Sequence, residues 1–282
     1  MELSFFTGRK WVIACFLVLL GGMFFGAITF VEAASFQQAK QLEEQGLYGG
    51  AFREYDEFLS NHPNHAGATL GILKTSIELE RWVRARKALE RFEQLQPNTT
   101  EAPKHGTRLY YRQEQYDTAL KWANQYKKRA TESWKPYHFL ARIYYRLRND
   151  AKMVQAVEDA EIRAPGSPWV IYDRLLLEHR LKGKINKNIL DRLLRRAENP
   201  HIFWSLVHWE QADWTNEQYK RFLGHGLEFF PSKEPPLTEP VSESRYRTVF
   251  ARTLYNGGAP ASEIRSVLNQ EVTGRTANWI RA

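Results

Sequence analysis

Cysteine is almost missing from this sequence, since Cys15 is the single thiol among 282 residues. One thiol cannot form an internal disulfide, a zinc knuckle or a CxxC redox pair. The chain also lacks the H-E-x-x-H, G-x-S-x-G and phosphate-cradling glycine patterns of common hydrolases and nucleotide-binding enzymes. We therefore predict no catalytic residues, no metal ligands and no cofactor, and we expect a protein that is not an enzyme.

The charge of the chain is basic. Forty lysines and arginines against 32 acidic residues give a formal net charge of +8. The hydrophobic share of 43% and the charged share of 26% are ordinary for a folded protein, which argues against wholesale disorder. A basic balance favours acidic partners such as acidic peptides, anionic polymers or lipid headgroups. The alternative is a solvated basic surface that binds nothing.

One apolar run dominates the N-terminus. Residues 11–31 hold 21 consecutive uncharged side chains, a length that crosses a bilayer as a helix. Arg9 and Lys10 precede the run, so the positive-inside rule keeps residues 1–10 in the cytoplasm. We predict a single-pass protein of the inner (cytoplasmic) membrane with its body on the periplasmic, extracytoplasmic side. A cleaved signal peptide is the alternative, although the apolar region of a signal peptide is usually shorter.

Residues of one kind recur along the chain every 34 positions. Small alanines suit the closest approach of two antiparallel helices, and a proline cannot continue a helix and so ends one. Agreement of several columns on one period predicts stacked repeats of two helices each. The columns are an aromatic residue (Tyr48, Trp82, Tyr116), an alanine (Ala51, Ala85, Ala119), a second aromatic residue (Phe58, Phe92, Tyr126) and a proline (Pro63, Pro97, Pro165).

These columns resemble the tetratricopeptide repeat (TPR) family over residues 32–167, as four repeats. The fourth repeat departs from the pattern, with Asp150 and Met153 in the aromatic and alanine columns, and the first helix of each repeat is degenerate. The resemblance implies an all-α, right-handed solenoid of helix-turn-helix repeats, which the N-terminal transmembrane helix would precede. It also implies a role in protein–protein interaction.

The pattern loosens after residue 167. We predict divergent TPR-like helices over residues 168–230, a proline-rich linker over 231–241, and a C-terminal helical hairpin or cap over 242–282. Thr215 and Gln218 have the spacing of a capping box. The helices are expected at residues 168–182, 187–197, 201–212, 219–230, 242–255 and 261–272. The spacing of Trp204, Trp209 and Trp214 favours partial burial in the core over a sugar-binding platform.

In the TPR family the first helices line a concave face, and the family register therefore predicts a binding groove. Arginine forks bind carboxylates in bidentate fashion, and tyrosines add flat stacking surface. Helices about 8–10 Å apart would meet roughly every third residue of an extended acidic strand. The alternative is that these cations pair with local carboxylates. The groove residues are Lys74, Arg108, Tyr111, Arg112, Arg142, Tyr145, Arg146 and Arg180, with His105 and His138 nearby.

The leading interpretation is a membrane-anchored, extracytoplasmic TPR scaffold that mediates protein–protein interaction in an envelope assembly or export complex. One alternative is a binding module for an anionic polysaccharide in exopolysaccharide or cell-wall biogenesis, whose binding would fall steeply with salt. Another is an enzyme in the divergent region 201–282, which would need clustered titratable residues there. A nucleic-acid partner is not expected, because an exported body meets little nucleic acid.

Overall fold

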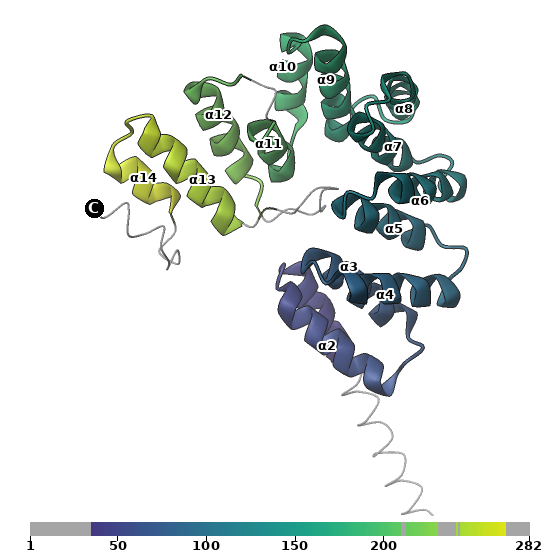
Figure 1. Cartoon of the computed structure of the whole chain (residues 1–282). Helices are drawn as coiled ribbons and strands as arrows, with labels where there is room; N and C mark the ends of the chain where they lie inside the picture. Colours follow the sequence, from purple (N-terminus) through teal and green to yellow (C-terminus); the bar gives the residue numbers. More distant parts are fainter. Residues whose placement is uncertain (1–34, 210–212, 231–240, 242, 269–282) are drawn as a thin grey trace, which may run out of the picture. The chain divides into compact units, whose positions relative to one another are not determined.

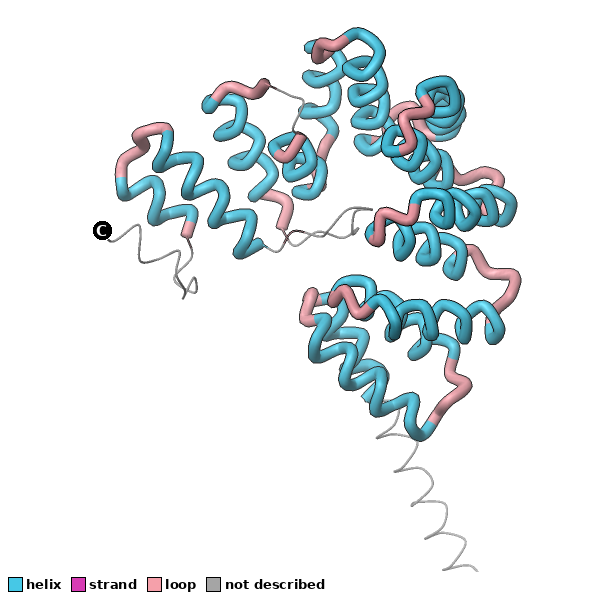
Figure 2. Tube along the Cα trace, viewed as in Figure 1, coloured by secondary structure: helices cyan, strands magenta, loops and turns pink. Residues whose placement is uncertain are grey.

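The computed structural model describes residues 35–209, 213–230, 241 and 243–268. These residues form helices joined by loops, and no strand occurs among them (Figure 2). The all-α prediction is therefore confirmed for the described part. The chain divides into two compact units, Met1–Pro97 (unit 1) and Asn98–Ala282 (unit 2), and each is described by itself.

Some predicted segments lie outside the described residues. They are the N-terminal segment over residues 1–31, most of the linker over 231–241, and the end of the chain after residue 268. Among the helices that the structure describes, none has the length and apolar character needed to cross a membrane.

Unit 1 contains a helix over residues 35–44, followed by α2 (Tyr48–Asn61), α3 (Ala66–Glu78) and α4 (Trp82–Leu95) (Figure 1). Helix α3 packs between its neighbours and contacts both α2 and α4. Gly71 makes this packing possible, because a Cβ atom there would lie 2.4 Å from the ring of Tyr55. The Tyr55 hydroxyl reaches back to the helix over residues 35–44 and donates to Glu43 Oε2 at 2.9 Å.

Unit 2 contains a longer series of helix pairs (Figure 1). Each of its helices up to α10 packs against the next, and the first helices of successive repeats also contact one another directly, α5 with α7 and α7 with α9. The helices are α5 (Glu101–Arg112), α6 (Tyr116–Arg129), α7 (Lys135–Arg146), α8 (Asp150–Arg163), α9 (Pro168–Lys182), α10 (Lys187–Arg196), α11 (Pro200–Val207), α12 (Asn216–Leu227), α13 (Glu243–Asn256) and α14 (Ala261–Val267).

The predicted period of 34 residues is present in the helices. The second helices of the four repeats, α2, α4, α6 and α8, begin at residues 48, 82, 116 and 150. Ala51, Ala85 and Ala119 are fully buried, and Met153 takes the same buried position in the fourth repeat. The columns therefore mark the helix contacts that the sequence predicts.

The turn between the two helices of a repeat has one residue in the left-handed conformation. Gly46, Glu80, Glu114 and Arg148 have φ values of 74°, 57°, 57° and 54°, and they are 34 positions apart. The next backbone N–H bonds to the carbonyl five residues earlier, as from Gln115 to Tyr110 at 2.9 Å. This bond defines the Schellman motif, whose left-handed position usually holds glycine. Three of the four turns keep this geometry without glycine.

Arginines in the C-terminal halves of α4, α6, α8 and α10 fasten four of the helix pairs. Each donates to the loop before the first helix of its own repeat, as Arg129 Nη1 does to the Thr99 carbonyl at 2.9 Å. We call these contacts the arginine clamps. They join Arg91 to Asn64, Arg129 to Thr99, Arg163 to Thr131 and Arg192 to Pro165.

The helix bounds predicted after residue 167 agree with the structure in part. Helix α9 has the predicted bounds, whereas α11 ends at Val207, five residues before the predicted end. The capping box of Thr215 and Gln218 is formed at the start of α12. Trp209 and Trp214 are buried with their ring centroids 6.2 Å apart, which confirms a core role for both.

Candidate functional site

Seven of the eight predicted groove residues lie on the first helices α5, α7 and α9 of unit 2. We call the surface that these seven residues mark the first-helix face. The eighth residue, Lys74, lies on α3 in unit 1, where it forms an ion pair with Glu43. The residues of the first-helix face are Arg108, Tyr111, Arg112, Arg142, Tyr145, Arg146 and Arg180.

Arginines and tyrosines of neighbouring helices meet along this face. Arg146 of α7 donates from Nε to the hydroxyl of Tyr111 of α5, in a long hydrogen bond of 3.4 Å. Arg180 of α9 lies over the ring of Tyr145 of α7, with 5.5 Å between Cζ and the ring centroid. A tyrosine ring attracts a cation by about 0.5–2 kcal/mol and leaves its charge in place. These contacts hold the guanidinium groups in position.

Arg142 makes the third such contact, and it involves a tyrosine that the sequence did not single out. Its Cζ lies 5.1 Å from the ring centroid of Tyr172 on α9. Burial disfavours the charged form of Arg142, but Tyr172, Tyr111 and Asp173 outweigh burial and raise its pKa. Arg142 therefore stays positively charged. We call the three contacts, Arg146 with Tyr111, Arg142 with Tyr172 and Arg180 with Tyr145, the arginine–tyrosine ladder.

The face differs from the predicted groove in what it exposes. Arg108 and Tyr111 are buried, with exposed fractions of 5% and 4%. Arg146 is exposed, and Arg112, Arg142 and Arg180 are partly exposed. Arg180 forms an ion pair with Asp150 at 2.9 Å, as the local-pairing alternative expects. Arg146 is thus the most exposed arginine of the face, and Arg112 lies partly exposed at the same repeat position.

A buried acid–base pair joins α7 to α9. His138 Nδ1 of α7 and Asp173 Oδ2 of α9 are 2.5 Å apart, and Asp173 is fully buried. In the described part of the chain, Asp173 Oδ1 has no hydrogen-bond partner. A buried carboxylate is costly unless it is paired. The pair therefore holds α9 against α7.

Two more buried histidines lie near the charge of Arg108. Burial lowers the pKa of His105 to about 4, although its Nε2 lies 3.1 Å from Glu101 Oε2. The hydrogen bond from His105 is the main reason that the Glu101 pKa is lowered to about 2. Burial and the charge of Arg108 lower the pKa of His201 to about 4. Both histidines are therefore neutral at pH 7, and the charge of Arg108 contributes to lowering the pKa of each.

Sequence reasoning missed Asp173 and Tyr172. Asp173 interrupts an apolar stretch of α9 whose neighbours Ile171 and Leu175 are buried. An acidic residue inside an apolar run is a signal for a buried polar contact. Its partner, His138, lies 35 residues earlier, one position away from the repeat spacing. Within the described residues, no group of three His, Cys, Asp or Glu side chains is arranged to hold a metal ion.

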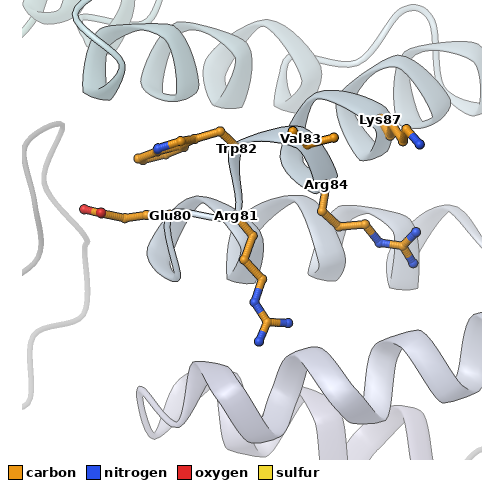
Figure 3. A pocket seen from close by; sticks show the side chains of 6 residues that line it. All are labelled: Glu80, Arg81, Trp82, Val83, Arg84 and Lys87. Atoms are coloured by element: carbon orange, nitrogen blue, oxygen red, sulfur yellow. The ribbon is translucent and has the colours of Figure 1, made fainter.

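A second surface lies at the start of α4 in unit 1, around a cavity of about 450 Å³ (Figure 3). Arg81 lies 4.3 Å above the ring of Phe52, and Arg84 forms an ion pair with Asp56 of α2. Figure 3 shows both arginines pointing away from Trp82. Two of the three cations are thus engaged within unit 1. The cavity is lined by Glu80, Arg81, Trp82, Val83, Arg84 and Lys87.

No family model and no curated protein sequence matches the chain. Among solved structures, MamA (residue 41 to the end) from Desulfovibrio magneticus RS-1 is 14% identical, with a TM-score of 0.50 over 64% of this chain and 97% of that one. PilF of Pseudomonas aeruginosa is 11% identical, with a TM-score of 0.53 over 71% of this chain and 92% of that one.

A third match is to the Cut9–Hcn1 hetero-tetramer of the APC/C. It is 12% identical, with a TM-score of 0.52 over 86% of this chain and 47% of the matched chain. Identities this low concern the fold alone. Part of this chain therefore has a TPR-like fold, which agrees with the family that its repeats resemble.

Proposed function

We propose that this protein is a scaffold for protein–protein interaction, and that the first-helix face of unit 2 binds an extended acidic segment of a partner. The observation that carries the proposal is that tyrosines hold Arg142 and Arg146 in place. Tyrosines order a guanidinium group without cancelling its charge. The face therefore offers positive charge that is already positioned for an anion.

The chemistry of the face suits carboxylates. An arginine fork donates two parallel hydrogen bonds to one carboxylate, and such charge-assisted bonds are about twice as strong as neutral ones. Arg112 on α5 and Arg146 on α7 occupy the same repeat position on neighbouring first helices. Since packed helices lie about 8–10 Å apart, the two arginines would meet acidic residues roughly three positions apart in an extended strand.

The TPR-like fold supports a binding role, because such repeats expose long surfaces to partners. One structural neighbour is described as part of a hetero-tetramer, an assembly of different chains. We propose the same general role here, in which unit 2 recruits a different protein.

We further propose that residues 11–31 anchor the chain in the inner membrane and that both units lie on the extracytoplasmic side. The 21 uncharged residues behind Arg9 and Lys10 support this location. The scaffold would then serve an envelope assembly or an export complex. A C-terminal alkaline phosphatase fusion in a bacterial host should be active, because that enzyme folds outside the cytoplasm. A fusion at background activity in the membrane fraction would contradict the orientation.

The binding test uses full-length protein in detergent and a fluorescein-labelled dodecamer of glutamate. We expect the Arg112→Glu/Arg146→Glu variant to bind at least tenfold more weakly than the parent, a change of about 1.4 kcal/mol or more. Lys121→Glu on the exposed surface of α6 is the matched control and should bind like the parent. Equal peptide affinity for the parent and the double variant would refute the proposal.

A second arm of the same experiment uses polygalacturonate, a polymer of carboxylated sugars. If the protein is a scaffold for protein partners, the glutamate peptide should bind more tightly per carboxylate than polygalacturonate does. Tight binding of polygalacturonate with no measurable binding of the peptide would support the polysaccharide-binding alternative instead.

A further inference from the structure

A small cavity lies between α10 and α12, away from the first-helix face. It has a volume of about 200 Å³ and is lined by Leu194, Arg195, Arg221 and His225. Arg195 lies in the last turn of α10. Arg221 and His225 lie four residues apart on α12, and this spacing puts both side chains on one face of that helix. The side chains of two arginines and one histidine thus line one cavity.

Among the described residues, the two arginines that line this cavity form no contact that stabilises the fold, unlike the other arginines of α10. Within the described residues, neither Arg195 nor Arg221 forms an ion pair or a hydrogen bond through its side chain. Other arginines of α10 are used by the fold: Arg192 clamps the Pro165 carbonyl, and Arg196 lies against Gly166. Arg195 and Arg221 therefore bring to the cavity two positive charges that form no ion pair with a described residue.

The histidine is held in place beside them. Its ring packs edge-on against Phe203 and Phe229, with centroid distances of 5.1 and 5.3 Å. His225 Nδ1 lies 3.5 Å from Glu228 Oε2, near the exposed end of α12. An imidazole supplies at least one hydrogen-bond donor in either protonation state. A fixed imidazole at the cavity wall can therefore contribute a directed hydrogen bond to a ligand.

We propose that this cavity binds a phosphate group. Phosphate monoesters carry a charge of about −1.5 to −2 at neutral pH, which matches the two arginines. Arginine forks also fit the oxygen geometry of phosphate. A monocarboxylate would neutralise only one of the two charges. The volume is below the range of about 300–1,000 Å³ for sites of drug-sized ligands, so a small anion or the phosphate end of a larger molecule fits it.

The site is independent of the proposed peptide-binding face, since the two share no residue. The test titrates inorganic phosphate into full-length protein in detergent by isothermal calorimetry, in a chloride buffer of low ionic strength. We expect one saturable site, bound at least tenfold more weakly by Arg195→Gln and by Arg221→Gln and not measurably by the double variant. Arg252→Gln on the exposed surface of α13 is the matched control and should bind like the parent.

Two further arms define the ligand. Acetate should bind at least tenfold more weakly than phosphate, because it carries a single charge. O-phosphoserine, as a monoester, distinguishes free phosphate from an esterified phosphate group: tighter binding than phosphate identifies the ester as the ligand. The proposal is overturned if phosphate shows no saturable binding, if acetate binds equally well, or if Arg252→Gln weakens binding as much as the cavity variants do.

Discussion

The left-handed turn residues allow a direct test of how the repeats are built. Glu114 and Arg148 occupy a backbone conformation that glycine adopts more easily, with φ values of 57° and 54°. Their side chains take part in no ion pair with a described residue. We therefore expect Glu114→Gly and Arg148→Gly to stabilise unit 2. Gly46 has the same position in unit 1, and Gly46→Ala should destabilise that unit.

The expected change in the free energy of unfolding follows from two opposing contributions. The left-handed conformation costs an L-residue about 1–2 kcal/mol. Glycine loses more backbone entropy on folding, which costs about 0.5–1 kcal/mol. Each substitution to glycine should therefore raise the free energy of unfolding by about 0.5–1 kcal/mol. Gly46→Ala should lower it by a similar amount through the backbone alone, because no atom lies within 4 Å of the added Cβ.

The assay is urea unfolding of the full-length protein, followed by circular dichroism at 222 nm. Glu90→Gly is the matched control: the same substitution at an exposed position inside α4 should lower the free energy of unfolding by about 1 kcal/mol. Glu114→Gly and Arg148→Gly should show higher urea midpoints and Gly46→Ala a lower one, all with unchanged slopes. If Glu114→Gly and Arg148→Gly are destabilised as Glu90→Gly is, the turn conformation does not limit stability and the reasoning fails.

The remaining predictions concern the buried groups of unit 2. The Asp173→Ala substitution removes the partner of His138 and should lower the free energy of unfolding by about 1–3 kcal/mol. A double-mutant cycle with His138→Ala should show coupling between the two residues, and zero coupling energy would contradict the pair. His105 and His201 have folded-state pKa values of about 4, below the ordinary 6.5, so the unfolded chain takes up their protons first. Their contribution to stability is full above pH 6.5 and is lost as the pH falls towards 4, on the order of 2 kcal/mol each by pH 5. His105→Gln/His201→Gln should flatten the pH profile of unfolding, and a parent protein equally stable at pH 7 and pH 5 would disprove the assignment.

The repeats could be predicted from the sequence because their contacts are local and periodic. Ala51 and Ala85 recur at the point of closest helix approach, and the period alone places them in the core. The end of α9 at Lys182 was also predictable, because Gly183 follows it in a left-handed conformation that stops a helix. Helix contacts and helix ends that depend on local backbone geometry can therefore be predicted from the sequence.

The state of the predicted site residues was not predictable in the same way. The period assigns Arg108 and Arg142 to one column, yet Arg108 is buried and its charge lowers the pKa of His201 on the distant helix α11. Whether a cation is open, stacked or paired depends on neighbours outside the repeat, and the period carries no information on them. The pairing of His138 with Asp173 is likewise a contact between repeats that is one residue out of register.

The arginine clamps have a consequence for how such a chain can change its length. Each clamp connects the end of a repeat to the loop at its own beginning, as Arg129 does with Thr99 and Arg163 with Thr131. A gene segment that encodes one such helix pair, or block, therefore encodes both residues of its clamp. Duplication or loss of a block therefore leaves every other clamp whole, so no new clamp has to evolve when the array grows or shrinks by recombination.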